Sequence, residues 1–209
     1  LQQQVTALHN HYQQLAEKLS KKRRAAANKL QKQVEKQLEQ LAMANCRFSI
    51  ALTARGDDKP HPQGAEEIAF LVSTNPGQQP QPLAKIASGG ELSRISLAIQ
   101  VITAKTSAIP TLVFDEVDVG IGGATAEVVG NLLQELGERG QVLCVTHQAQ
   151  VASKGHQHLY VSKTASKHSV STKLMQLNED KKIEEIARML GGIAITDQSL
   201  AHAKEMLSH

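Results

Sequence analysis

The first part of the chain spaces its apolar side chains in alternating steps of four and three. The series is Leu1, Val5, Leu8, Tyr12, Leu15 and Leu19. This is the spacing of a heptad seam, so it predicts that residues 1–45 form one helical strand of a coiled coil. Leu30 and Leu41 follow at steps of eleven, which predicts that the supercoil unwinds locally after Leu19.

The polar positions of this predicted helix are mainly basic. Three acids (Glu17, Glu35 and Glu39) accompany eight basic residues, which are Lys18, Lys21, Lys22, Arg23, Arg24, Lys29, Lys32 and Lys36. Two interpretations stay open: a solvated helix face, or a basic stripe that contacts DNA phosphates.

A change from helical to alternating periodicity predicts strands after the helix. Residues 47–53 alternate as a half-buried strand does, and residues 68–72 form its returning partner. A loop rich in Gly, Asp and Pro separates them at 56–64. The Gln- and Pro-rich segment up to Pro82 is interpreted as an ordered connector.

The remainder alternates helices with short apolar strands. A helix is expected from Ser88 to about Thr106, and a second one over 124–136. Strands are expected at 109–114 and 141–146, and this alternation predicts an α/β fold with a parallel sheet. The apolar face of the first helix is expected to comprise Leu92, Ile95, Ser96, Ile99 and Ile102. Two alternating segments and two helices should follow, at 158–163, 169–177, 181–190 and 198–207.

The amino-acid composition of the chain limits the kinds of function that it could have. Aromatic residues make up only 2% of 209 residues, so stacking platforms for single-stranded nucleic acid are not evident, and a net charge of +3 permits DNA without requiring it. Cys46 and Cys144 lack metal-ligand spacing and suggest inert thiols in a reducing compartment. No apolar run approaches the roughly 18 residues of a membrane helix.

The chain begins inside a helical pattern without Met, so it is expected to be the C-terminal piece of a longer protein.

Ser88-Gly89-Gly90-Glu91 opens the first helix of the α/β part. Ser followed three residues later by Glu is a capping box, and glycines at a helix start expose N–H groups and the positive dipole end to an anion. With Ala87 before it and Leu92-Ser93 after it, the stretch has the pattern of an ABC-type signature motif.

Two carboxylates end the strand 109–114, where α/β proteins bind ligands. Asp115 is expected to hold Mg²⁺ through water, and Glu116 is expected to polarise the attacking water as general base. Asp118 is expected to have a turn or capping role.

His147 ends the next strand and is expected to contact the γ-phosphate of ATP, with a structural role as the alternative. His156 and His158 lack further ligands nearby, so no metal beyond Mg²⁺ is expected. No Gly-Lys dipeptide occurs in the chain, so the phosphate-binding loop is absent and the chain should not bind ATP tightly alone.

The stretches SGGELSRISLAIQVI, TLVFDEVDVGIGG and VTHQAQVAS, after FLVSTNPG and the coiled-coil strand, closely resemble the RecN family of bacterial DNA repair proteins. That family consists of SMC-like relatives of the ABC ATPases. One departure concerns the loop after the acid pair, where many ABC proteins carry Asp and this chain has Gly122.

This resemblance implies the C-terminal lobe of an ATPase head over residues 46–209, joined to the returning coiled-coil strand 1–45. The N-terminal half-head would bear the phosphate loop, and two heads would dimerise around two ATP molecules. Ser88, Gly89, Gly90 and Glu91 would then contact the ATP of the partner head in trans. The family further implies ATP and Mg²⁺ as cofactors, double-stranded DNA with broken ends as partner, the SOS response, and a cytoplasmic, nucleoid-associated location without membrane contact.

Two other functions compete with this one. The ATPase subunit of a transporter shares the motifs, but it needs no extended coiled coil before this lobe. A non-catalytic module that associates through its helix is the third possibility.

Overall fold

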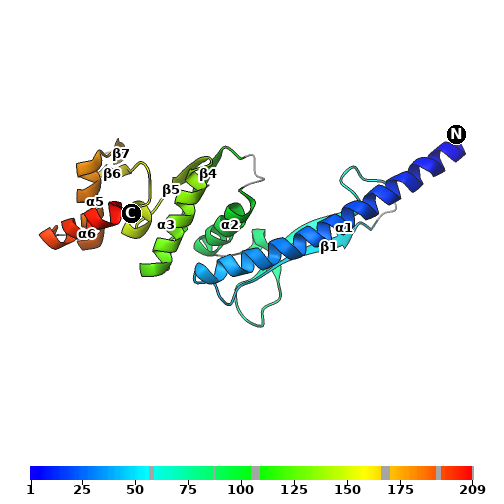
Figure 1. The fold of residues 1–209 in the computed structure, drawn as a ribbon, viewed down its shortest axis with the longest axis horizontal. Coiled ribbons are helices and arrows are strands. Elements are labelled where there is room, and N and C mark those ends of the chain that lie inside the picture. The colour runs from blue at the N-terminus through cyan, green and yellow to red at the C-terminus, as the bar shows by residue number, and fades with distance from the viewer. Residues whose placement is uncertain (57–58, 87, 105–108, 166–169, 192–193, 209) are drawn as a thin grey trace. The chain divides into compact units, whose positions relative to one another are not determined.

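The computed structural model describes residues 1–56, 59–86, 88–104, 109–165, 170–191 and 194–208 (Figure 1). These residues form two compact units, Leu1–Ser88 and Gly89–His209. The predicted division into a coiled-coil strand and an ATPase lobe near residue 45 stays a prediction. Each unit is described by itself.

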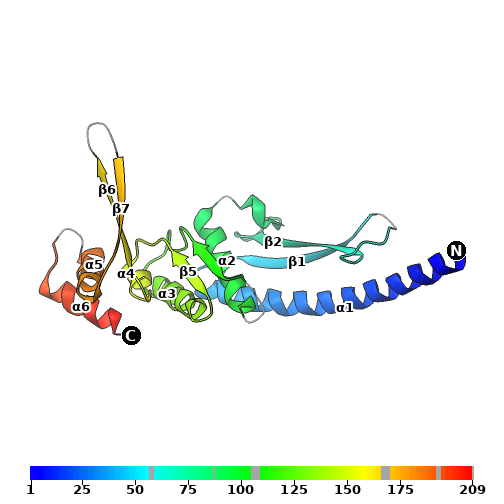
Figure 2. The same cartoon turned by 90° about the horizontal axis from the view of Figure 1, so that it is seen from above.

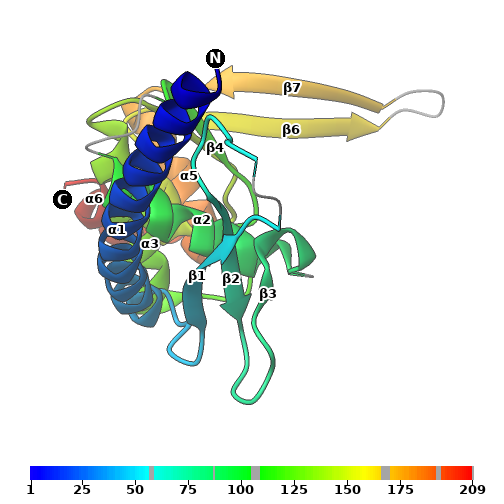
Figure 3. The ribbon, with the colours of Figure 1, turned by 90° about the vertical axis from the view of Figure 1, so that its right-hand side faces the viewer.

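The first unit consists of one long helix and a small antiparallel sheet. Helix α1 runs without interruption over Gln2–Gln40. Strands β1 (Arg47–Ala54) and β2 (Glu66–Ser73) pair as predicted, with Ile50 opposite Phe70. The predicted connector contains a strand that the sequence did not reveal: β3 (Gln81–Pro82) extends the sheet beside β2 and leads into the 3₁₀ turn Leu83–Lys85. Figure 3 shows α1 beside the three strands.

The second half of α1 packs on this sheet. Val34, Leu38, Leu41 and Phe48 are fully buried, and the ring centroids of Phe48 and Phe70 lie 5.6 Å apart. These side chains form the core of the first unit. Along the first half of α1, the predicted seam residues Leu1, Val5, Leu8 and Leu15 are more than half exposed in this chain.

The loop between β1 and β2 rests on α1. The backbone N–H of His61 donates to Tyr12 Oη at 3.0 Å, and a side chain at Gly64 would begin 3.0 Å from Leu19 Cδ2. Arg24 pairs with the buried Glu66 at 3.3 Å. Two residues of the predicted seam, Tyr12 and Leu19, therefore contact a loop of their own unit.

The second unit begins with helix α2 (Gly89–Thr103), followed by β4 (Thr111–Phe114), α3 (Gly123–Gly137) and β5 (Gln141–Cys144). Strands β4 and β5 are parallel, which confirms the prediction. A short helix, α4 (Ala149–Ala152), follows β5. Residues 105–108, at the predicted end of α2, and Ala87 lie outside the described residues.

The predicted apolar face of α2 was partly wrong. Ser96 and Leu92 are exposed, whereas the buried residues are Gly90, Arg94, Ile95, Leu97 and Ala98. Positions 90, 94, 97 and 98 share one helical face because a turn takes about 3.6 residues. The prediction missed this face because it contains Gly and Arg, which do not count as apolar.

The predicted tail is present. Strands β6 (Leu159–Ala165) and β7 (Val170–Gln176) form an antiparallel ribbon that extends away from helices α5 (Glu179–Gly191) and α6 (Asp197–Leu207) (Figure 2). Residue 169, the predicted start of the second segment, lies outside the described residues. Ala149, Ile186, Ala187 and Ala203 form the buried cluster that joins α4 to α5 and α6. None of the described helices has the length and hydrophobicity that a membrane crossing needs.

Candidate functional site

The glycines at the start of α2 lie against the loop that follows β4. A side chain at Gly89 would overlap Glu116 Oε2, and one at Gly90 would begin 3.1 Å from Glu116 O and 3.3 Å from Val119 O. Helix α2 starts directly after Ser88, as the capping-box pattern predicted. The structure thus brings Gly89 and Gly90 together with Glu116. The positive end of the α2 dipole favours a carboxylate there.

Glu116 has an unusual backbone conformation. Its φ of 59° lies in the left-handed region, which a non-glycine residue adopts rarely and at a cost of about 1 kcal/mol or more. The side chains of Asp115 and Glu116 are both exposed at the carboxyl end of β4. Ser93 Oγ donates to Asp115 O at 2.6 Å, and Arg94 Nη1 donates to Val119 O at 2.8 Å. The loop is therefore held at both ends by α2.

Asp118 connects this loop to the loop after β5. It is 1% exposed, and its Oδ2 accepts hydrogen bonds from Thr146 Oγ1, His147 N (3.1 Å) and Gln148 N (3.3 Å). Hydrogen bonds to an ionised acceptor are about twice as strong as neutral ones. Asp118 lies in a turn, as expected, and its side chain additionally links two loops, which the sequence did not predict. An acid four positions after a strand, at the edge shared by a parallel neighbour, is the available signal.

His147 lies at the same edge of the sheet as the acid pair, because β4 and β5 are parallel neighbours. Its Nδ1 is 3.4 Å from Asp118 Oδ1, and its side chain is 62% exposed. Gln148 Nε2 donates to Ile121 O at 2.9 Å and lies 3.3 Å from His147 Nε2. The ring is thus held by two neighbours while most of it faces solvent.

The Cys144 thiol next to this edge stays protonated at neutral pH and is therefore a poor nucleophile. Burial, followed by the charges of Asp118 and Asp115, raises the pKa of Cys144 to about 12. The nucleophilic thiolate is therefore scarce at neutral pH. Cys46 is buried in the first unit.

The acid pair suits Mg²⁺ bound mainly through water. Among the described residues, no group of three or more His, Cys, Asp or Glu side chains could hold a metal. Mg²⁺ commonly keeps several waters and binds through one or two carboxylates together with substrate phosphates. The exposed carboxylate of Asp115 fits that mode.

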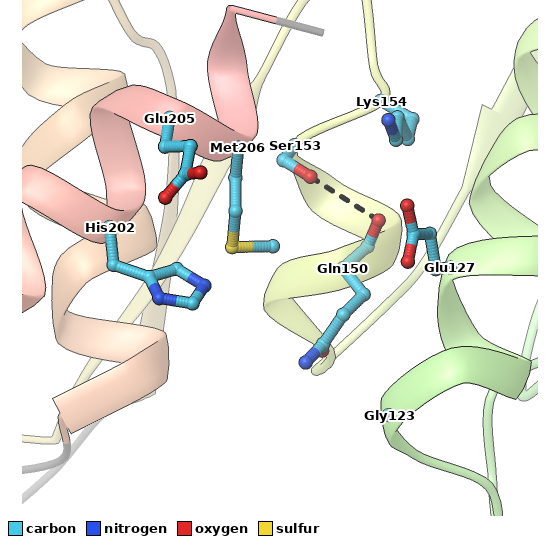
Figure 4. A pocket seen from close by; sticks show the side chains of 8 residues that line it. All are labelled: Gly123, Glu127, Gln150, Ser153, Lys154, His202, Glu205 and Met206. Atoms are coloured by element: carbon cyan, nitrogen blue, oxygen red, sulfur yellow. Dashed lines mark hydrogen bonds between the residues drawn. The ribbon is translucent and has the colours of Figure 1, made fainter.

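One hollow of the second unit lies apart from this edge. It is formed by α3, α4 and α6, and Figure 4 shows its lining of Gly123, Glu127, Gln150, Ser153, Lys154, His202, Glu205 and Met206. None of the predicted site residues lines it. Asp115, Glu116 and His147 lie at an exposed sheet edge, apart from this hollow.

We predict that Asp118→Ala destabilises the second unit by about 2–4 kcal/mol, because buried donors that faced an ionised acceptor would lose their partner. Urea unfolding followed by circular dichroism measures the change. Asp115→Asn, at an exposed neighbouring carboxylate, should stay within about 0.5 kcal/mol of the parent. Equal effects of the two substitutions would contradict the role of Asp118.

We predict that Gly122→Asp stabilises the chain by a few tenths of a kcal/mol. Gly122 is the N-cap of α3 in extended conformation with open space around it, and Asp is a favoured cap. Gly120→Asp is the matched control: its φ of +75° disfavours any side chain, so it should destabilise by about 1 kcal/mol. Thermal unfolding of both variants tests the assignment, and the same sign for both would refute it.

Comparison with solved structures defines the fold class of this chain. The chain is similar to the SMC head domain with a coiled coil and joint from Pyrococcus yayanosii, at a TM-score of 0.53 and 17% identity over 78% of this chain and 29% of that one. It also resembles the SMC head domain with an extended coiled coil, bound to the C-terminal domain of ScpA, from Pyrococcus furiosus (TM-score 0.50, 17% identity, 77% and 37% covered). The chain therefore has the fold of a part of an SMC-type head domain, together with a long N-terminal helix.

Sequence comparison identifies the relatives. The chain is 49% identical to the DNA repair protein RecN of Vibrio cholerae, over 99% of this chain and 37% of that protein. The RecN proteins of Haemophilus influenzae and Treponema pallidum are 52% and 40% identical, over 93% and 99% of this chain and 35% and 37% of their own length. No protein-family model matches. Nearly the whole chain is thus homologous to RecN, as its motifs predicted, and it spans little more than a third of these relatives.

Proposed function

We propose that this chain is the signature-bearing half of an ATP-hydrolysing head that acts in DNA repair. The observation that carries this proposal is the meeting of Asp115, Glu116 and His147 at one edge of a parallel sheet, with the glycine start of α2 against Glu116. The similarity to RecN proteins and to SMC heads supports it.

In this proposal each residue has a separate task. Asp115 would hold Mg²⁺ through water, Glu116 would take a proton from the attacking water, and His147 would contact the γ-phosphate. Bound ATP supplies the phosphoryl group. Ser88, Gly89, Gly90 and Glu91 contact the ATP of a partner head in trans.

A complementary half of the head is required because the chain contains no Gly-Lys dipeptide for a phosphate loop. An apolar surface is available for such a partner: Val113, Leu143 and Val145 are 67%, 45% and 63% exposed. We propose that the N-terminal half of the same protein covers it. Two such heads would form a homodimer around ATP, act on double-strand breaks in the SOS response, and reside with the nucleoid in the cytoplasm.

Mixing this chain with a polypeptide that carries the N-terminal half should produce ATPase activity that neither part has alone. Glu116→Gln should lower turnover by roughly 10² to 10⁴ fold while ATP still binds, because a general base contributes in that range. Steady-state phosphate release with and without double-stranded DNA is the measurement. Unchanged turnover of Glu116→Gln would remove Glu116 from the mechanism.

The basic residues of α1 divide into paired and solvent-facing ones. Lys21 pairs with Glu17 at 2.8 Å, Arg24 pairs with Glu66, and Arg23 Nη1 is buried. The remaining five are exposed, and we name them the lysine face: Lys18, Lys22, Lys29, Lys32 and Lys36.

The lysine face is a continuous stripe. At about 100° per residue its members fall within an arc of roughly 80°, and at 1.5 Å per residue they extend over about 27 Å. Glu17, Glu35 and Glu39 lie outside this arc. Such a stripe can follow a phosphate backbone, and we propose it as the DNA contact of this unit.

Replacing Lys22, Lys29 and Lys32 by Gln in the reconstituted protein should reduce the slope of log affinity for duplex DNA against log salt concentration by about 2–3, because each neutralised phosphate contributes about 0.9. Fluorescence anisotropy at several salt concentrations gives the slope. Lys85, Lys181 and Lys204 are also exposed, so their triple Gln variant is the matched control with the same change in charge. Equal slopes for the two triple variants would leave the lysine face as a solvated surface.

A further inference from the structure

The backbone on both sides of Glu116 is held by consecutive residues of α2. Ser93 Oγ donates to the carbonyl of Asp115, at 2.6 Å, on one side of Glu116. Arg94 Nη1 donates to the carbonyl of Val119, at 2.8 Å, on the other side. Neither residue belongs to the set assigned above to ATP, Mg²⁺ or water.

The conformation that these two bonds hold is a strained one. Glu116 keeps a positive φ of 59°, although its side chain is exposed. A left-handed residue that costs about 1 kcal/mol persists only where its surroundings restrain it. Gly90 adds to the restraint, since its Cα hydrogen faces Glu116 O and Val119 O, which would be 3.1 and 3.3 Å from a Cβ.

The buried position of Arg94 is unfavourable for the stability of the fold. It is 8% exposed, burial lowers its pKa against the opposing effect of Glu91, and within the described part of the chain its Nε has no hydrogen-bond partner. A buried cation with incomplete hydrogen bonding destabilises a fold relative to an apolar side chain of similar volume. Stability alone therefore does not explain an arginine here, whereas its bond to Val119 O does.

We propose that Ser93 and Arg94 are positioning residues that hold the carboxylate of Glu116 in place for water activation. This inference rests on the proposed ATPase function. Displacing a catalytic group by about 1 Å can cost on the order of 10² in rate, so the loss of either bond should lower turnover without weakening the binding of ATP.

The test uses the reconstituted head with its N-terminal half. Ser93→Ala should lower kcat about tenfold and leave the KM for ATP within about twofold, because the hydroxyl contacts a carbonyl of the loop. Ser93→Thr, which keeps the hydroxyl, should stay within about threefold of the parent. Ser96→Ala is the matched control, since Ser96 is an exposed serine on the same helix. Arg94→Met should lower kcat at least as much, with its folding checked by thermal unfolding; Ser93→Ala carries the test if that variant misfolds.

A double variant separates positioning of Glu116 from a general structural effect. In a Glu116→Gln background, Ser93→Ala should change the residual rate by less than about twofold, because the group it positions is gone. An equal fold loss in both backgrounds would overturn the inference, as would parent-like turnover of Ser93→Ala. Either result leaves the proposed function intact if the parent is active and Glu116→Gln is slower by roughly 10² to 10⁴ fold. If the parent mixture itself shows no hydrolysis although it is folded, the proposed function fails.

Discussion

The parallel pairing of β4 with β5 is the constraint on which the geometry of the site depends. Phe114 lies opposite Cys144 in this register, so the residues that follow each strand emerge at the same edge. Asp118 then links the two loops through its bonds to Thr146, His147 and Gln148. A shift of the register would leave a buried carboxylate without donors, which costs several kcal/mol. The pairing of β4 with β5 and the hydrogen bonds of Asp118 therefore both fix the position of the site and stabilise the unit.

Helix α2 imposes the second constraint. Gly90 leaves room for the carbonyls of Glu116 and Val119 close to the helix, Gly89 leaves room for the Glu116 carboxylate, and the following turn supplies two donors to the loop. Glu116 is thus fixed through its main chain, while its side chain stays exposed. This arrangement suits a group that must reach a water molecule, because packing of the side chain itself would restrict access.

Local patterns predicted most of the elements and the position of the acid pair at the end of β4, but they missed β3 and α4. Apolar runs bounded by Gly and Pro predicted β4 and β5, and alternation predicted β1, β2 and the ribbon of β6 and β7. The features that sequence reasoning missed depend on contacts distant in the chain. The buried face of α2 includes Arg94 because the carbonyl of Val119 faces it, and the role of Asp118 requires donors 28–30 residues away. Neither contact produces a periodic pattern in the amino-acid sequence.

The proposed site is open to solvent within the described part of the unit. Asp115 and Glu116 are exposed, and the ring of His147 is 62% exposed, so their interactions with a phosphate would be weakened by water. Catalytic electrostatics are strong only where water is excluded and the groups are preorganised. The contacts of the loops after β4 and β5 provide the preorganisation, whereas the described residues of this unit leave these three side chains open to water. The apolar side chains of Val113, Leu143 and Val145 lie on the same two strands and their continuation. A partner that buried these three residues would also bring its own surface close to the edge, so the association that stabilises the sheet would at the same time lower the dielectric around the acid pair.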